Sequence, residues 1–299
     1  MASLAVKNLF GVAGKTVAVT GGSRGIGFMI ASGFVQNGAH VIITARNADQ
    51  CAEAAAELNA LAASGGGDGD GDQQGSCVAL PGDLSTVEGC DAFAAQVADT
   101  FSTSRSMEPP ALNVLVNNSG TSWGAPLERF PEAGWDKVMD LNVKAPFFLT
   151  KACLPLLRAG ASPDDPARVI NVGSIAGIRG MSTPTYSYDV SKASIHMLTQ
   201  KLGHDLAHGA GGHAGGGRVT VNAIAPGIVP SAMSNQLQAY ATEESLSRSA
   251  PLGRQGRASD MAGAALFLAS QAGAWITGTT VSVDGGCVAL PLPIRDDDH

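Results

Sequence analysis

The sequence predicts an α/β fold, a single doubly wound, parallel, seven-stranded sheet with helices on both faces. Short apolar, β-branched segments alternate along the 299 residues with segments of helical length. The apolar segments are continuous rather than interrupted by polar residues, which is typical of strands buried on both faces. Alternation of such strands with helices indicates a parallel sheet covered by helices.

Seven segments are expected to form the strands. In chain order they are KTVAVT (15–20), HVIITA (40–45), CVALPG (77–82), LNVLVN (112–117), RVINVG (168–173), RVTVNAI (218–224) and TTVSVDG (279–285). Because all seven fit one sheet, we expect residues 1–299 to form one domain with its core at about residues 14–288.

The segments between the strands carry helix and loop signals. Ser85 and Glu88 have the spacing of a capping box at the start of a helix. The glycine-rich stretches 64–76 and 209–217 each lie between a helix and the next strand, which favours flexible surface loops over phosphate cradles. The tail 289–299 is expected to be an extended or disordered end.

Residues 134–158 are expected to form a helix that contains Pro146. Proline has no N–H for the carbonyl of Asn142, four residues back, so the helix should kink there. A carbonyl released at the kink could hold a water that feeds protons to Lys192. A kink that serves packing alone explains the segment equally well.

Composition excludes several classes of function. A net charge of −7 offers no basic field for nucleic acid or an anionic membrane. The five cysteines are scattered without a CxxC pair, so we expect neither a metal site nor disulfides. Reduced thiols favour a cytoplasmic location, or an organelle if a transit peptide has been removed. No apolar run is long enough to cross a bilayer.

The stretch TGGSRGIG (20–27) follows the first strand and opens the first helix. Glycines at such a turn allow close approach of the backbone to a ligand, and the N–H groups of the helix face a phosphate. The spacing is Gly21-x-x-x-Gly25-x-Gly27, with Ser23, Arg24 and Ile26 between them. The strand–turn–helix context predicts a dinucleotide site.

The end of the second strand indicates which dinucleotide. An NAD site places an acid there for the ribose 2′-hydroxyl, but this chain has Thr44-Ala45-Arg46-Asn47 and no acid before Asp49. Arg46 and Arg24 could bind a 2′-phosphate from two sides, which favours NADP(H). Each arginine by itself could equally be a solvated surface charge.

Two further strand ends carry polar residues. In GDLS (82–85), Asp83 could accept a hydrogen bond from the adenine amino group or cap the next helix. In NNSG (117–120), Asn117 and Gly120 could line the cofactor or only form a turn.

Tyr188 and Lys192 stand at helical i and i+4 positions and so share one face, whereas Tyr186 has Val190 at that spacing. A free tyrosine ionises too reluctantly to be a good acid–base group near neutrality. We expect Lys192 and an oxidised nicotinamide ring to lower the pKa of Tyr188. Ser174, at the end of the fifth strand, could bond the same substrate oxygen or serve as a turn residue.

The joint order of TGGSRGIG, GDLS, NNSG, LNV, NVGS, Tyr188-x-x-x-Lys192 and IAPG resembles the short-chain dehydrogenase/reductase family over residues 14 to about 288. The resemblance implies a Rossmann-like sheet, a catalytic tetrad of Asn142, Ser174, Tyr188 and Lys192, a water relay at the Asn142 kink, and a homotetramer or dimer. Tyr188 and Lys192 would also contact the cofactor, and so would Leu84, Asn118, Gly120, Pro226, Gly227, Ile228 and Ser231. Two departures are NNSG for the usual NNAG, and Ser231 where a threonine is common.

More narrowly, NNSGTSWGAPLE, LPLLR, DDPARVINVGSIAGI and APGIVPSAM resemble bacterial rhamnolipid-type NADPH-dependent 3-oxoacyl reductases. This implies a β-ketoacyl thioester substrate. Trp123, Ser174, Met233 and Leu237 are the expected substrate residues. Met233, Leu237 and Tyr240 have helical spacing, which also fits an ordinary core-facing stripe.

The sequence therefore predicts an NADPH-dependent carbonyl reductase of a small keto or hydroxy compound, most simply a 3-oxoacyl thioester. An alcohol, polyol or steroid-type dehydrogenase of the same fold is the alternative among enzymes. An NADP-binding regulator without turnover is the alternative outside enzymes, although a regulator has no physical need for Tyr188 and Lys192 together.

Overall fold

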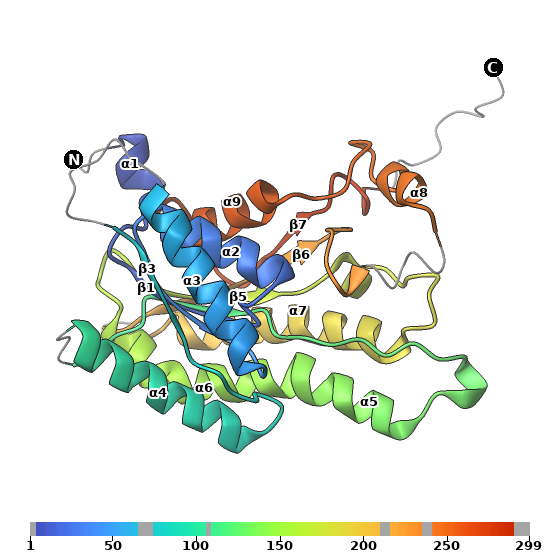
Figure 1. Cartoon of the computed structure of the whole chain (residues 1–299), viewed down its shortest axis with the longest axis horizontal. Coiled ribbons are helices and arrows are strands. Elements are labelled where there is room, and N and C mark those ends of the chain that lie inside the picture. Colours follow the sequence, from blue (N-terminus) through green and yellow to red (C-terminus); the bar gives the residue numbers. More distant parts are fainter. Residues whose placement is uncertain (1–3, 65–73, 106–108, 210–215, 235–240, 290–299) are drawn as a thin grey trace.

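The computed structural model describes residues 4–64, 74–105, 109–209, 216–234 and 241–289. All seven predicted strands are present and form one parallel sheet in the order β3-β2-β1-β4-β5-β6-β7 (Figure 1). Their bounds are β1 Thr16–Thr20, β2 His40–Thr44, β3 Ser76–Ala79, β4 Val114–Asn117, β5 Ala167–Val172, β6 Val219–Pro226 and β7 Thr280–Val283. We propose that the core of about residues 14–288 is one domain.

Helices cover both faces of the sheet (Figure 1). On one face lie α2 (Gly25–Gln36), α3 (Ala48–Ser64) and α9 (Ala258–Ala269), and on the other lie α4 (Val87–Arg105), α6 (Ala145–Ala159) and α7 (Tyr186–Leu206). The remaining α-helices of the described chain are α1 (Val6–Leu9), α5 (Glu132–Met139) and α8 (Glu243–Arg248). The predicted fold class is confirmed.

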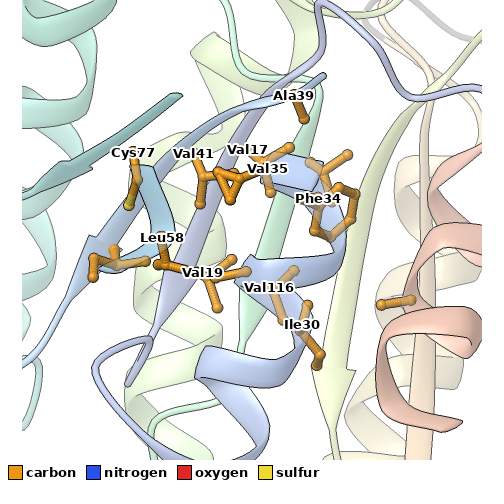
Figure 2. Packing of buried hydrophobic residues seen from close by; sticks show 14 of the residues in the cluster. Val17, Val19, Ile30, Phe34, Val35, Ala39, Val41, Leu58, Cys77 and Val116 are labelled. Carbon is orange, nitrogen blue, oxygen red and sulfur yellow. The ribbon is translucent and has the colours of Figure 1, made fainter. Parts of the chain in front are cut away.

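The core consists of an apolar cluster on each face. Between α2 and the sheet, Ile30 and Phe34 pack in one cluster with Val19 of β1 (Figure 2). The strands read as continuous apolar runs because both faces are covered, and β1, β4 and β5 are buried throughout. β1 lies between β2 and β4, so the chain winds outward in both directions from this point. Such sheets bind ligands at the carboxyl ends of the strands beside that switch.

One local prediction was wrong. Thr86, not Ser85, caps α4, because the helix begins at Val87 and its Gly89 N–H donates to Thr86 Oγ1 at 3.1 Å. Residues 134–158 are helical as predicted, and the expected irregularity at Asn142 is a π-helical turn, η2 (Asp140–Lys144), between α5 and α6. Pro146 lies in the first turn of α6, where its missing N–H is tolerated.

Most of both glycine-rich stretches and all but the first residue of the tail 289–299 lie outside the described residues. Within the described ranges, no helix is both long and apolar enough to cross a membrane. The same ranges contain no cluster of three or more His, Cys, Asp or Glu side chains suited to a metal ion.

Candidate active site

A cavity of about 740 Å³ opens at the carboxyl edge of the sheet. Its lining comes from the turn after β1, from the ends of β2 to β6, from α7, and from the segment after β6. The predicted residues that line it are Gly21, Ser23, Arg24, Gly25, Ile26, Arg46, Asp83, Leu84, Asn118, Gly120, Ser174, Tyr188, Lys192, Pro226, Gly227, Ile228, Ser231 and Met233. Motifs distant in sequence thus meet in one space.

The turn after β1 requires its glycines. Gly21 and Gly25 have φ of 63° and 56°, a region that side chains disfavour. A Cβ on Gly27 would lie 2.3 Å from the Gly21 carbonyl oxygen and 2.4 Å from Asn118 Nδ2, so Gly27 underlies the cavity instead of lining it. The backbone can therefore approach a ligand closely where the N-terminus of α2 begins.

The two asparagines at the carboxyl end of β4 have different roles. Asn118 lines the cavity and braces the glycine turn, donating from Nδ2 to the Thr20 carbonyl at 2.8 Å. Asn117 is 5% exposed and donates to Asn171 Oδ1 at 2.9 Å beneath the cavity. Of the two roles left open for Asn117, lining the cavity is therefore not the one observed, because its side chain bonds Thr150 of α6 and Asn171 of β5.

The end of β2 presents polar and cationic groups to the cavity. Thr44 Oγ1 is buried without a hydrogen-bond partner among the described residues, and Arg46 lies two residues further on. Arg24, at the N-cap of α2, lines the same space, and neither arginine forms an ion pair within the described ranges. These donors and the glycine cradle fit a dinucleotide that carries a 2′-phosphate.

Tyr188 and Lys192 lie on the first turns of α7, and Ser174, which follows β5, is hydrogen-bonded to the Tyr188 side chain. Lys192 Nζ is 5.5 Å from the centre of the Tyr188 ring and donates to the Val172 carbonyl at 2.8 Å. Tyr186 is 40% exposed and packs edge-on against Phe130 with ring centres 5.7 Å apart. The geometry thus selects Tyr188 and gives Tyr186 a packing role.

Burial is the largest influence on the pKa values of Tyr188 and Lys192. Desolvation raises the pKa of Tyr188, the negative charge of Asp189 raises it further, and the Ser174 side chain opposes both. The expected net lowering by Lys192 was wrong for the protein without cofactor. Burial lowers the pKa of Lys192 itself to about 8, and its ammonium is directed at the Val172 carbonyl. A hydroxyl held protonated at neutral pH suits a proton donor.

Asn142 lies in the π-helical turn and is 2% exposed. Its Nδ2 donates to the Thr121 carbonyl at 2.9 Å and to Ser191 Oγ at 3.0 Å, and its Oδ1 accepts from the Thr121 N–H at 2.8 Å. The side chain does not line the cavity. It joins the kink to the β4 end and to the face of α7 beside Tyr188.

Comparison with known proteins decides the family. The family described as "Enoyl-(Acyl carrier protein) reductase" matches residues 21–288. A rhamnolipids biosynthesis 3-oxoacyl-[acyl-carrier-protein] reductase from Pseudomonas aeruginosa is 43% identical over 281 residues, 93% of this chain and 97% of the relative. The chain belongs to the short-chain dehydrogenase/reductase family.

Other members of this reductase family support the assignment. The 3-oxoacyl-[acyl-carrier-protein] reductase FabG of Chlamydia trachomatis is 34% identical, covering 91% of this chain and 96% of the relative. The structure of the "Pseudomonas aeruginosa RhlG/NADP active-site complex" is similar with a TM-score of 0.80 and 42% identity, over 94% of this chain and 98% of that one.

Only some of the residues expected to contact the substrate line the cavity. Met233 lines the cavity, and Ser231 does so with its N–H donating to Ser234 Oγ at 2.8 Å. Trp123 does not, because its ring packs on α5, where a Cβ on Gly134 would lie 2.7 Å away. Leu237 and Tyr240 lie outside the described residues.

One wall of the cavity was missed from the sequence. Met181, Thr183 and Thr185, in the segment between β5 and α7, line it together with Asp189. The segment carries no motif and no periodicity, so only its position before Tyr188 could have indicated a role. Thr44 was also missed, although it directly precedes the residues that favoured NADP(H).

Proposed function

We propose that this chain is an NADPH-dependent carbonyl reductase that acts on a 3-oxoacyl thioester, with Tyr188 as general acid. The observation that carries the proposal is that the glycine cradle and Arg46 share one cavity with Ser174, Tyr188 and Lys192. The likeness to 3-oxoacyl-[acyl-carrier-protein] reductases at 43% and 34% identity supports the substrate class.

The roles of the chain's own groups follow from their positions. Bound NADPH would supply a hydride to the carbonyl carbon. The Tyr188 hydroxyl gives its proton to the carbonyl oxygen, so the ketone becomes an alcohol. Ser174, whose side chain lies within hydrogen-bond reach of Tyr188, donates a hydrogen bond to the same oxygen and orients it. Lys192 is fixed at the base by Val172 and helps to return a proton to Tyr188. Asn142 holds the kink beside them.

The deciding experiment is NADPH oxidation by the purified protein, followed at 340 nm against 3-oxoacyl thioesters, diketones, quinones and keto-steroids. We expect the thioesters to give the highest kcat/KM. A preference for keto-steroids, or NADP+ reduction with alcohols or polyols in the reverse assay, would replace the proposal by the alternative dehydrogenase function. NADPH binding without turnover of any of these would favour the NADP-binding regulator.

Replacing Arg46 with aspartate should shift the cofactor preference. Aspartate repels a 2′-phosphate and accepts a hydrogen bond from the 2′-hydroxyl of NADH, so we expect the NADPH to NADH preference to fall by about tenfold or more. Titration of cofactor fluorescence measures it. The matched control is Arg129→Asp, an exposed arginine outside the cavity. An unchanged preference in Arg46→Asp would remove Arg46 from the cofactor site.

We further propose a homo-oligomer, a dimer or tetramer, assembled through the outer face of α6 and α7. Phe147 on α6 and Val190 and Met197 on α7 are 40%, 44% and 64% exposed, and burial of these apolar side chains between subunits would stabilise such an assembly. Light scattering should give a multiple of 30.2 kDa, and Met197→Glu should reduce it. A monomer in the unmodified protein would contradict this.

A cytoplasmic location remains a prediction, and cell fractionation would test it.

A further inference from the structure

The segment Met181–Thr185 forms a wall of the cavity and has little structure of its own. It connects η3 (Ile175–Gly177) to α7 and contributes Met181, Thr183 and Thr185 to the lining. On its outer side, the Pro184 carbonyl accepts from the Ala125 N–H at 3.1 Å. A segment without helix or strand keeps its shape only through such anchors.

Asp189 supplies the anchors on the inner side. Its Oδ2 accepts from the Met181 N–H at 2.9 Å, and its Oδ1 accepts from the Thr185 hydroxyl at 3.2 Å. One carboxylate thus joins both ends of the segment to the helical turn that carries Tyr188. The side chain itself lines the cavity.

Asp189 also sets the charge at this end of the cavity. Among the described residues, the charged side chains of the lining are Arg24, Arg46, Asp83, Asp189 and Lys192. The first three belong to the turn after β1 and the ends of β2 and β3, where the dinucleotide is expected. Beside Tyr188 remain only Asp189, which has no ion-pair partner in the described chain, and Lys192.

Lys192 offsets this negative charge weakly. Lys192 is 6% exposed, and its Nζ donates to the Val172 carbonyl at the end of β5. Burial lowers the pKa of Lys192 to about 8, so its positive charge declines in mildly alkaline solution. The carboxylate of Asp189 is the nearer charge for a group that enters along Met181–Thr185.

We propose that Asp189 is a positioning and specificity-determining residue that fixes the Met181–Thr185 wall and makes the site select uncharged 3-oxo esters and thioesters over free 3-oxo acids. The inference rests on the proposed function. In a free 3-oxo acid the carboxylate stands one methylene from the ketone, so its charge must enter the same end of the cavity as Asp189. In an ester or thioester that position is neutral.

The kinetic test compares ethyl 3-oxobutanoate with 3-oxobutanoate at pH 8 under saturating NADPH. The unmodified protein should have the higher kcat/KM for the ester. Asp189→Asn loses the charge, but its amide oxygen can still accept from the Met181 N–H and its amide N–H can donate to the Thr185 hydroxyl oxygen. The substitution should narrow the ratio of the two kcat/KM values by about tenfold. Asp205→Asn is the matched control, since it removes an exposed charge from the same helix. A ratio unchanged in Asp189→Asn overturns the specificity role.

The positioning role has a readout that does not need turnover. In hydrogen–deuterium exchange, peptides covering 178–186 should exchange at least about tenfold faster in Asp189→Ala, because Met181 loses its acceptor. Asp189→Asn and Asp205→Asn should stay near the unmodified rate. Equal protection in Asp189→Ala overturns the positioning role. If the unmodified protein reduces neither substrate, the proposed function and the specificity role fail together, while the exchange rates still decide the positioning role.

Discussion

Replacing Tyr188 with phenylalanine is expected to lower kcat by about a thousandfold, within the range that a general acid contributes. The substitution removes one hydroxyl and keeps the ring that fills the space above Lys192 Nζ. The cofactor site is formed by the glycine turn and the arginines, so the dissociation constant of NADPH should change little. Single-turnover reduction of the best thioester, with NADPH binding measured by fluorescence, separates the two effects.

The neighbouring tyrosine provides the control. Tyr186→Phe also deletes one hydroxyl from the first turn of α7, but Tyr186 contacts Phe130 and does not line the cavity. Its kcat should stay within about twofold of the unmodified value, as expected of a surface substitution away from the site. Activity retained in Tyr188→Phe, or lost equally in both variants, would contradict the acid–base role of Tyr188.

The fold could be predicted because the apolar pattern of each strand segment agrees with the burial of that strand in the folded sheet. The segments of β1, β4 and β5 are apolar throughout since helices cover both faces, and this pattern is visible without any tertiary information. The Tyr188–Lys192 pair was predictable for the same reason, because helical spacing alone places the two side chains on one face. The glycine turn was predictable from its place between a strand and a helix.

The features of the site that could not be predicted from the sequence depend on contacts between segments that are distant in the chain. Trp123 lies near the fourth strand in sequence, but glycine at position 134 leaves a space on α5 that its ring occupies. Likewise, the pKa of Tyr188 depends on how deeply α7 is covered, and burial outweighs the opposing hydrogen bond from the Ser174 side chain. The Met181–Thr185 wall takes its place from Asp189 and Ala125, which no motif indicates.

The second substitution with a large expected effect lies in an ionic cluster at the amino ends of the strands, at the edge of the sheet away from the cavity. Arg168, at the start of β5, is 1% exposed and binds Asp165 Oδ1 through Nη2 at 2.7 Å. The same nitrogen donates to the Ser270 carbonyl at 2.9 Å, and Lys15 binds the other oxygen of Asp165. Arg168 Nε and Nη1 have no hydrogen-bond partner among the described residues, so Asp165 is the charge that compensates a buried guanidinium.

Asp165→Asn should therefore destabilise the protein at pH 7, because it leaves the Arg168 charge buried without its counter-ion. Losing one partner of a fully buried pair costs about 3–5 kcal/mol, and solvent reduces this to about 1–3 kcal/mol here because the Asp165 side chain is 38% exposed. Urea unfolding of both proteins measures the difference. The exposed neighbour offers the control, and Asp164→Asn should change little.

The effect should also depend on pH in a defined direction. Burial raises the pKa of Asp165, but the hydrogen bonds and charges of Lys15 and Arg168 outweigh it and hold the pKa below its ordinary 3.8. A carboxylate with a lowered pKa in the folded state contributes stability above its ordinary pKa, and this contribution is lost as the pH falls through the lower folded value. The stability difference between the unmodified protein and Asp165→Asn should thus be constant from pH 7 to pH 5 and shrink below about pH 4. A difference of the same size at pH 3 as at pH 7 would contradict the ionic role of Asp165, because a protonated carboxyl and an amide present nearly the same shape to Arg168 and only the charge distinguishes the two proteins.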